Sequence, residues 1–228
     1  MSQAGLEAID LLTGLPPQEL QALAEQCRWR SVPEHNQFLG QDDDIRDVFF
    51  VVEGAVRLVS YTLAGREIFF GTVQAGDYFG EITTSDGVTR RVGALTVEDT
   101  RLAVMPSATF RTALVKHPEL MDRVVDRLAT IVHALDERVM DLYTLPAPMR
   151  VYAELLRLAE PDAVTKDSWV IWPMRTCSDI ASRAHTTRET ATRAISELIT
   201  KSVVERVSKS LYIRDHDELM RLAGKERQ

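Results

Sequence analysis

Two arginines and a glutamate in the segment RETATR, residues 188–193, are the side chains with the most distinctive chemistry in this chain. On a helix, Arg188, Glu189, Thr192 and Arg193 would lie on one side, opposite the apolar side chains. An arginine can bond bidentately to guanine O6 and N7, and a glutamate accepts a hydrogen bond from cytosine N4. This side is therefore suited to reading base edges. The alternative is a solvated charged face on which Glu189 only caps its own helix.

The segment around these residues, 176–198, contains two short helical patterns separated by a turn. The first repeats apolar residues at 180, 181 and 184, and the second at 191, 194, 195 and 198. Thr176 and Thr186 are suitable N-caps, and Asp179 and Glu189 stand three residues after them, as in capping boxes. Small alanines between the two helices indicate close packing. The pattern predicts a helix-turn-helix whose second helix enters a major groove.

The distribution of charge agrees with this interpretation although the whole chain carries −7. Residues 146–228 hold 14 Lys/Arg against 12 Asp/Glu, and the remainder holds 13 against 22. Within 175–214 there are 8 basic and 4 acidic residues. The positive excess is small, but it lies where contact with phosphates would need it.

The segments on either side of the two helices complete a small domain. Residues 144–148, TLPAP, predict a break after a long helix, because a residue before proline avoids helical geometry. A helix with Val151 and Leu155 follows, and then a strand at 169–172. Residues 203–213 predict a hairpin with Lys209 at its tip, where a wing could contact phosphate, and a short helix lies in the tail after Asp215.

The first half of the chain has the period of β-strands. Val48, Phe50 and Val52 point to one side, and Gly54 occupies a tight-turn position. Many short strands with regular turns predict a barrel or a double-sheet roll. Strands and helices do not alternate along this region, so a Rossmann sheet is not expected. Short helices precede these strands at 6–26. The expected strands are 29–32, 37–39, 47–53, 56–62, 66–73 and 102–105.

The same region contains GDYFGEI at 76–82, followed by Arg90 and Arg91. Phosphate binding needs inward backbone N–H groups and a cation, and glycine lets the backbone approach the ligand closely. A nearby carboxylate such as that of Glu81 can bond ribose hydroxyls. The segment therefore indicates a nucleotide phosphate site.

A long helix is expected to begin near Pro118. Its apolar residues recur at spacings of three and four, which predicts a coiled-coil seam of about three heptads. The alternative is a helix that lies against its own β-domain, and both interpretations can hold for different faces. The seam comprises Leu128, Ile131, Leu135, Val139 and Leu142, preceded by Val124 and Val125.

These segments together resemble the cyclic-AMP receptor protein (Crp/Fnr) family of transcription regulators over nearly the whole chain. RETATR is similar to the R-E-T-V-x-R recognition helix of that family, which reads a TGTGA-type half-site. By this resemblance Arg188, Glu189 and Arg193 make base contacts, and Thr187, Thr192 and Lys209 complete the contact set. His185 stands where the family usually has a turn glycine with positive φ, which histidine tolerates less well than glycine.

The phosphate segment resembles the family's cyclic-nucleotide cassette. The resemblance implies that Glu81 binds the ribose 2′-OH, that Arg90 pairs with the cyclic phosphate, and that Gly80 and Ile82 supply backbone contacts. Arg91 departs from the family's Ser, Thr or Ala, and either adds phosphate charge or projects into solvent. Thr83 and Thr84 depart from the small apolar residues that the family has there.

A second part of the ligand site is implied by the long helix. Leu135 and Asp136 replace the Thr-Ser pair that the family places against the purine. A carboxylate at 136 could accept from adenine N6 or from guanine N1 and N2, so both cAMP and cGMP are candidates. The alternative for Asp136 is an exposed ion pair between helices.

The resemblance implies an α+β fold with an N-terminal β-roll similar to a jelly roll, a long dimerisation helix and a C-terminal winged helix-turn-helix. The expected domains are the sensor at 1–117, the dimerisation helix at 118–143, the hinge at 144–148 and the DNA-binding domain at 149–228. The expected protein is a cytoplasmic homodimer that binds a palindromic duplex operator and RNA polymerase, and no membrane. Effector binding would shift the equilibrium between two arrangements of the DNA-binding domains.

Other classes and inputs are weighed against this hypothesis. Cys27 and Cys177 are too far apart in sequence to suggest a disulfide, a metal site or an iron–sulfur cluster. A haem input stays open through His35, His117 and His133, and ligand-independent activity stays open as well. The sequence shows no pairing of a nucleophile with a base, no cluster of metal ligands and no P-loop, so an enzyme is not expected. No apolar run reaches membrane-spanning length.

Overall fold

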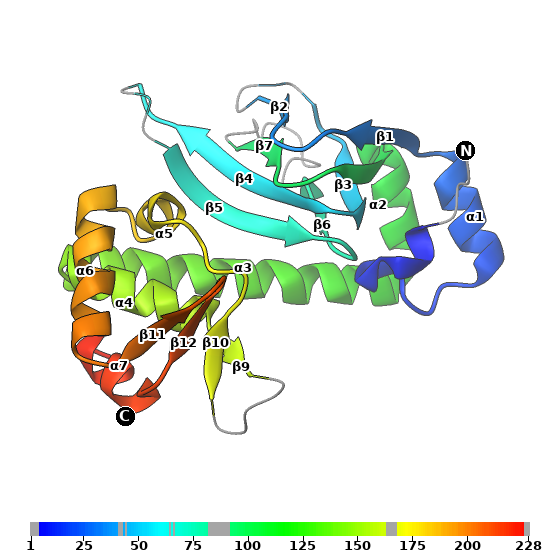
Figure 1. The fold of residues 1–228 in the computed structure, drawn as a ribbon. Coiled ribbons are helices and arrows are strands. Elements are labelled where there is room, and N and C mark those ends of the chain that lie inside the picture. Colours follow the sequence, from blue (N-terminus) through cyan, green and yellow to red (C-terminus); the bar gives the residue numbers. More distant parts are fainter. Residues whose placement is uncertain are drawn as a thin grey trace. The chain divides into compact units, whose positions relative to one another are not determined.

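A computed structural model describes residues 5–40, 43, 45–63, 65, 67–81, 92–162 and 168–225. Its internal contacts divide the chain into two compact units, residues 1–132 and residues 133–228 (Figure 1). Helix α3 (Pro118–Thr144) contributes its first part to one unit and its last turns to the other. The α+β architecture predicted from the sequence is confirmed.

The first unit is built on two four-stranded sheets with the orders β1-β8-β3-β6 and β2-β7-β4-β5, in which all neighbours are antiparallel. Short helices precede the strands, and α2 follows them. The elements are η1 (Leu6–Ala8), η2 (Asp10–Leu12), α1 (Pro17–Glu25), β1 (Arg28–Val32), β2 (Gln37–Leu39), β3 (Val48–Glu53), β4 (Ala55–Tyr61), β5 (Glu67–Gln74), β6 (Tyr78–Phe79), β7 (Gly93–Thr96), β8 (Thr100–Met105) and α2 (Ser107–Lys116).

Strand β3 lies at the centre of this unit and is apolar on both faces. Val48, Phe50 and Val52 point into a core formed with the helices, as their alternation predicts. Phe49 and Val51 point the other way, into the core between the two sheets. Successive side chains of a strand face opposite sides, so one strand supplies both cores.

Gly54 makes the turn from β3 to β4 possible. Its φ is +84°, and a Cβ placed there would lie 2.5 Å from the carbonyl oxygen of Asp99. Both the positive φ and the close approach of backbone exclude an ordinary side chain. The tight turn predicted at this glycine is confirmed.

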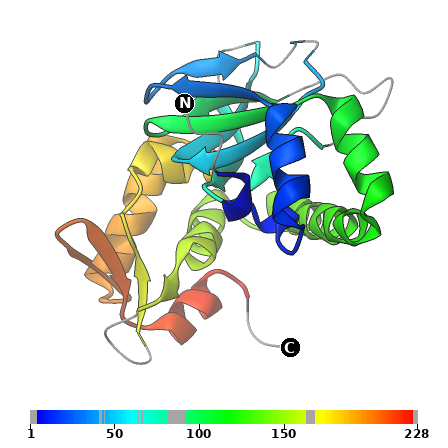
Figure 2. The same ribbon diagram turned by 90° about the vertical axis from the view of Figure 1, so that its right-hand side faces the viewer.

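Helices cover the outer face of the β1-β8-β3-β6 sheet. Figure 2 shows α1, α2 and the start of α3 gathered on one side of the strands. Leu120 and Val124 of α3 are buried there, and Arg123 donates to the carbonyl oxygens of Leu11 and Thr13 at 2.8 and 2.6 Å. Val124 therefore belongs to the core of its own unit, and its assignment to the coiled-coil seam was wrong.

The opposite side of α3 carries a stripe of exposed apolar residues. Val132 is 65% exposed, and five more side chains in the stripe are between 41 and 55% exposed. They recur at alternating spacings of four and three, with the half-buried Leu128 in register, and this is the heptad pattern of a coiled-coil seam. The stripe comprises Met121, Val125, Leu128, Val132, Leu135, Val139 and Leu142. We call it the α3 stripe. Ile131, which the sequence analysis placed in the seam, is half-buried and out of this register, and Val132 takes its place.

The second unit packs four helices on one antiparallel sheet of order β11-β12-β10-β9. Its core collects the apolar faces predicted for the paired helices, including Ile180, Ala191 and Leu198. The predicted hairpin is confirmed. The elements are α4 (Ala147–Leu158), β9 (Glu160–Pro161), β10 (Trp169–Ile171), α5 (Cys177–Arg183), α6 (Arg188–Thr200), β11 (Val204–Val207), β12 (Ser210–Ile213) and α7 (His216–Leu222).

None of the helices that the structure describes is long and apolar enough to span a bilayer.

Candidate nucleic-acid interface and ligand site

Helix α6 exposes the side chains that the sequence marks for base contacts. Arg188, Glu189, Thr192 and Arg193 are all exposed, whereas the opposite side of the helix is buried in the core. Among the described residues, neither arginine side chain hydrogen-bonds or pairs with an acid. Both guanidinium groups lie on one exposed helix face, where their charges also help to lower the pKa of Glu189, and they are accessible to bases or phosphates.

The start of α6 lies one residue later than the capping pattern predicts. Thr187 is the N-cap, and its Oγ1 accepts from the backbone N–H of Thr190 at 3.3 Å. The assignment of Thr186 as the cap was wrong. A hydrogen bond from its own backbone amide, and then one from Thr187, hold the pKa of the exposed Glu189 carboxyl below its ordinary value. Glu189 is therefore an anion, as acceptance from cytosine requires.

The turn between the two helices explains why Thr186 does not cap α6. His185 has φ +49°, and the amide of Thr186 donates to the carbonyl of Ala181 at 2.9 Å. The amide of His185 donates to Ser182 at 3.3 Å, which completes a Schellman motif at the end of α5. His185 thus takes the left-handed position at which the family has glycine, and Thr186 closes the first helix. The cap predicted at Thr176 is confirmed, since it accepts from the amide of Asp179 at 3.1 Å.

The wing places one more cation on the surface. Lys209 is exposed at the tip of the β11–β12 hairpin, beside Ser208 with φ +54°. The carbonyl of Lys209 accepts from the amide of Met174 at 2.7 Å, which ties the tip to the loop before α5. The tip therefore has a fixed position relative to the first helix of the pair.

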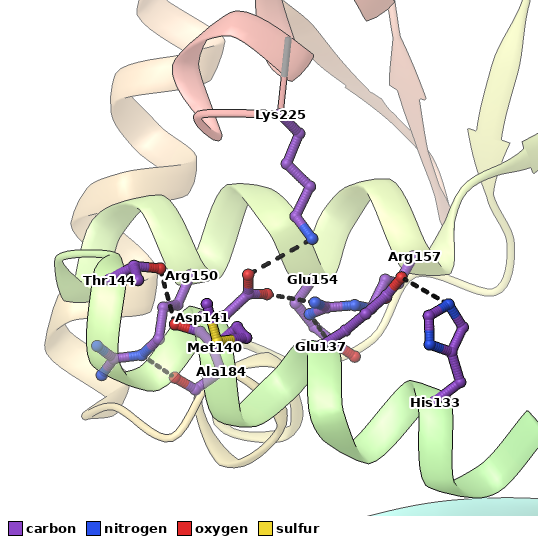
Figure 3. A network of polar contacts seen from close by, with 10 residues as sticks. All are labelled: His133, Glu137, Met140, Asp141, Thr144, Arg150, Glu154, Arg157, Ala184 and Lys225. Carbon is purple, nitrogen blue, oxygen red and sulfur yellow. Dashed lines mark hydrogen bonds and ion pairs between the residues drawn. The ribbon is translucent and has the colours of Figure 1, made fainter. Parts of the chain in front are cut away.

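Buried charges join the end of α3 to the helix pair (Figure 3). Asp141 pairs with Arg157, and Arg157 lies 3.4 Å from Glu154. Glu154 pairs in turn with Arg183 of α5 at 3.6 Å. Burial, opposed mainly by Asp179, lowers the pKa of the Arg183 guanidinium, which stays charged at any physiological pH. No local sequence pattern predicts this chain of pairs, because its members are up to 42 positions apart.

The ligand site is only partly within the described residues. Gly80 has φ +101°, and Glu81 is buried with 5% of its side chain exposed. Burial raises the pKa of the Glu81 carboxyl, and a nearby Arg127 opposes that rise. Ile82, Arg90 and Arg91, which the sequence also assigns to this site, lie outside the described residues.

Arg127 of α3 is a member of this site that the sequence analysis missed. Its Nε lies 3.5 Å from Glu81, its guanidinium pairs with Asp77, and it donates to the carbonyl of Tyr78 at 2.6 Å. The guanidinium also stacks 4.3 Å from the centre of the Tyr78 ring. The only indication in the sequence was its position between Val124 and Leu128, which places a charged side chain at the edge of the buried face of the helix. Arg127 holds the glutamate and its loop to α3.

The expected second part of the ligand site lies on the last turns of α3. Leu135 is 41% exposed and Asp136 is exposed, both in the unit of residues 133–228. The assignment of these two residues to the nucleotide stays a prediction.

The three histidines considered for a haem input and the two cysteines do not come together in one site of the described part of the chain. His35 and His133 are exposed, and His117 lies between Glu19 and Glu119 at 3.7 and 3.5 Å. Within the described ranges, no group of three or more potential ligands could hold a metal ion. Cys27 and Cys177 are free thiols, and burial raises the pKa of Cys27 to about 12.

An antiparallel double-sheet roll, followed by a long helix and a winged helix-turn-helix, defines a class of ligand-responsive DNA-binding proteins. Comparison with known families agrees: residues 29–117 match the cyclic nucleotide-binding domain, and residues 149–222 match the Crp-like helix-turn-helix domain. The chain belongs to the Crp/Fnr family and is a DNA-binding transcription regulator with a cyclic nucleotide-binding domain.

Individual relatives match nearly the full length. A CRP-like cAMP-activated global transcriptional regulator of Mycobacterium tuberculosis is 23% identical over 214 residues, which cover 93% of this chain and 96% of that protein. The structure of a CooA mutant from Carboxydothermus hydrogenoformans is 19% identical with a TM-score of 0.77, and the match covers 87% of this chain and 88% of that chain. The c-di-GMP-responsive global regulator CLP of Xanthomonas campestris is 18% identical with a TM-score of 0.72, covering 87% and 99%. At these identities the two structures show the fold alone.

Proposed function

We propose that the protein is a homodimer that reads a palindromic, TGTGA-like operator and is gated by a cyclic nucleotide, cAMP or cGMP. The observation that carries the operator proposal is the exposed trio of Arg188, Glu189 and Arg193 on one face of α6. Two such helices related by a twofold axis enter successive major grooves, which makes the site a palindrome. Thr187, Thr192 and Lys209 contact the operator around the trio.

The α3 stripe supports the homodimer. Seven apolar residues in heptad register run along a helix whose other side already packs into its own unit. Exposed apolar seams of this kind are buried by a second helix. In this proposal 1–117 is the sensor, 118–143 the dimerisation helix and 149–228 the DNA-binding domain, and RNA polymerase is the further partner on the promoter.

The ligand proposal has separate support. The domain match, the positive φ of Gly80 and the buried Glu81 suit a site for ribose and phosphate. In this proposal Ile82, Arg90 and Arg91 are the remaining residues of the site. The Mycobacterium relative is named as cAMP-activated. Leu135 and Asp136 are assigned to the base. The Xanthomonas relative is named as responsive to c-di-GMP, so this dinucleotide is the comparison ligand in any titration.

A selection from random duplexes tests the operator proposal. We expect an enriched palindrome, and we expect Arg188→Ala to flatten preference at one base pair of each half-site. Lys201→Ala is the matched control, because it removes an exposed positive charge at the other end of α6. A selection without an enriched motif, or an unchanged profile in Arg188→Ala, would contradict the proposal.

Calorimetric titration with cAMP, cGMP and c-di-GMP tests the effector. Arg90→Ala should abolish binding of a cyclic mononucleotide and leave non-specific DNA binding intact, because it removes the cation expected at the phosphate. Arg111→Ala, an exposed arginine of α2, is the control. Binding that survives in Arg90→Ala means that the phosphate lies elsewhere. A Soret band in the purified protein would favour haem instead.

A further inference from the structure

The joint between α3 and α4 is held by one arginine that also holds the helix-turn-helix. Arg150 donates from Nη1 to the carbonyl of Leu145 at 2.9 Å, immediately after α3 ends. The same guanidinium donates to the carbonyls of Ala184 and His185 at 3.0 Å each, in the turn between α5 and α6. Figure 3 shows Arg150 reaching Ala184 beside the last turn of α3. A single planar group therefore fixes the joint to the turn that aims α6.

A second connection runs through a partly buried chain of ion pairs, in which positive and negative side chains alternate. Six side chains from the C-terminal segment, α3, α4 and α5 follow one another, each pairing with the next, and three are positive and three negative. The side chains of Glu154 and Arg183 are 1% and 8% exposed, and that of Asp141 is 12% exposed. In order they are Lys225, Asp141, Arg157, Glu154, Arg183 and Asp179.

Such a chain resists movement more than an apolar contact does. Apolar surfaces can slide past each other at little cost, because dispersion and hydrophobic attraction are not directional. A buried charge that loses its partner keeps the full penalty of desolvation. Turning the end of α3 relative to α4 would separate the buried Asp141 from Arg157. Turning α4 relative to α5 would separate the buried Glu154 from Arg183.

We infer that Asp141 and Arg150 are positioning residues, which lock the last turns of α3, α4 and the helix-turn-helix into one rigid body. The segment 144–148 is then a fixed joint and not a flexible hinge. The last turns of α3, the joint and the helix-turn-helix all lie in the compact unit of residues 133–228. Any motion that gates DNA binding starts upstream of the joint, and this statement rests on the proposed effector gating.

Hydrogen–deuterium exchange of the full-length protein tests the rigid joint. In Asp141→Asn we expect amides of residues 142–150 to exchange about tenfold faster than in wild type, with α6 unchanged. Glu218→Gln is the matched control, because it makes the same change in an exposed pair with Arg221 in the same unit. Unchanged exchange at 142–150, or an equal rise in every helix of the unit, would overturn the inference.

Affinity for the selected operator supplies the second readout. We expect Asp141→Asn and Arg150→Lys each to weaken operator binding by at least about fivefold while binding to random duplex stays the same. Arg150→Lys keeps the charge but loses the three-way fork, so it tests position without leaving a buried acid unpaired. Operator affinity equal to wild type in both variants would refute positioning. If no nucleotide alters operator affinity in wild type, the gating proposal fails, whereas the exchange data still decide the rigid joint.

Discussion

Val132→Asp is the substitution that most directly tests the proposal that two copies of this chain associate through the α3 stripe. Val132 is the most exposed member of the α3 stripe, and it stands in the middle of the seam. Aspartate at this position should separate the subunits without unfolding either one, because the valine contributes little to the core of its own unit.

The size of the effect can be worked from exposure. Fully burying a valine stabilises by about 1.5–3 kcal/mol, and the 65% of Val132 that is exposed accounts for about 1–2 kcal/mol of this. In a twofold-symmetric dimer the substitution occurs once in each subunit, so the free energy of association falls by about 2–4 kcal/mol. That corresponds to a dissociation constant raised by about 30-fold to several hundredfold. Desolvation of two carboxylates adds to the loss.

Sedimentation velocity over a dilution series measures this constant directly. Thr130→Asp is the control, because Thr130 is exposed on the same helix but lies two residues before Val132, outside the stripe. Circular dichroism checks that both variants stay folded. Should Val132→Asp remain as dimeric as Thr130→Asp, the seam would be elsewhere and the coiled-coil argument would be wrong.

Four further outcomes are expected. Gly54→Ala should destabilise the first unit by at least about 2 kcal/mol in thermal unfolding, because φ is +84° and its Cβ would meet a backbone oxygen. Arg188→Ala should weaken operator binding by about 1–3 kcal/mol in fluorescence anisotropy, with a salt dependence that is little changed if the contact is to a base. Thr176→Ala should lower the unfolding free energy of the second unit by about 1 kcal/mol through loss of the α5 cap. Burial raises the pKa of Glu81 in the folded state above its ordinary value of 4.5, so its ionisation opposes folding as pH rises through and above that value. Glu81→Gln should therefore raise the melting temperature of the ligand-free protein at pH 7, and the difference should vanish below about pH 4.5.

Periodicity explains which elements could be predicted. The alternation in β3 and the threefold and fourfold spacing in α5 and α6 each follow from one buried face, so the sequence pattern and the fold agree. Helix α2 was missed because its apolar residues, Phe110, Ala113 and Leu114, form a short face among polar neighbours. Strands β6 and β7 were missed because they are only two and four residues long.

Contacts distant in sequence explain what could not be predicted at the sites. The exposed trio on α6 follows from local spacing, because the buried side of the helix defines the outer side. By contrast, Arg127 meets Glu81 only because α3 packs on the sheet, and no local pattern pairs residues 46 positions apart. Thr187 and not Thr186 caps α6, because the amide of Thr186 is used to end α5. The local sequence around two adjacent threonines does not show which of them will be the cap.

The depth of the charge chain beneath the helix pair means that dissolved ions act unequally on the second unit. Mobile ions screen exposed charges strongly and enclosed ones weakly. Because phosphate contacts release counterions, DNA binding by this unit, including the contact proposed for Lys209, should weaken steeply as salt rises. A salt titration would thus detach this protein from its duplex long before it loosened the scaffold that aims α6.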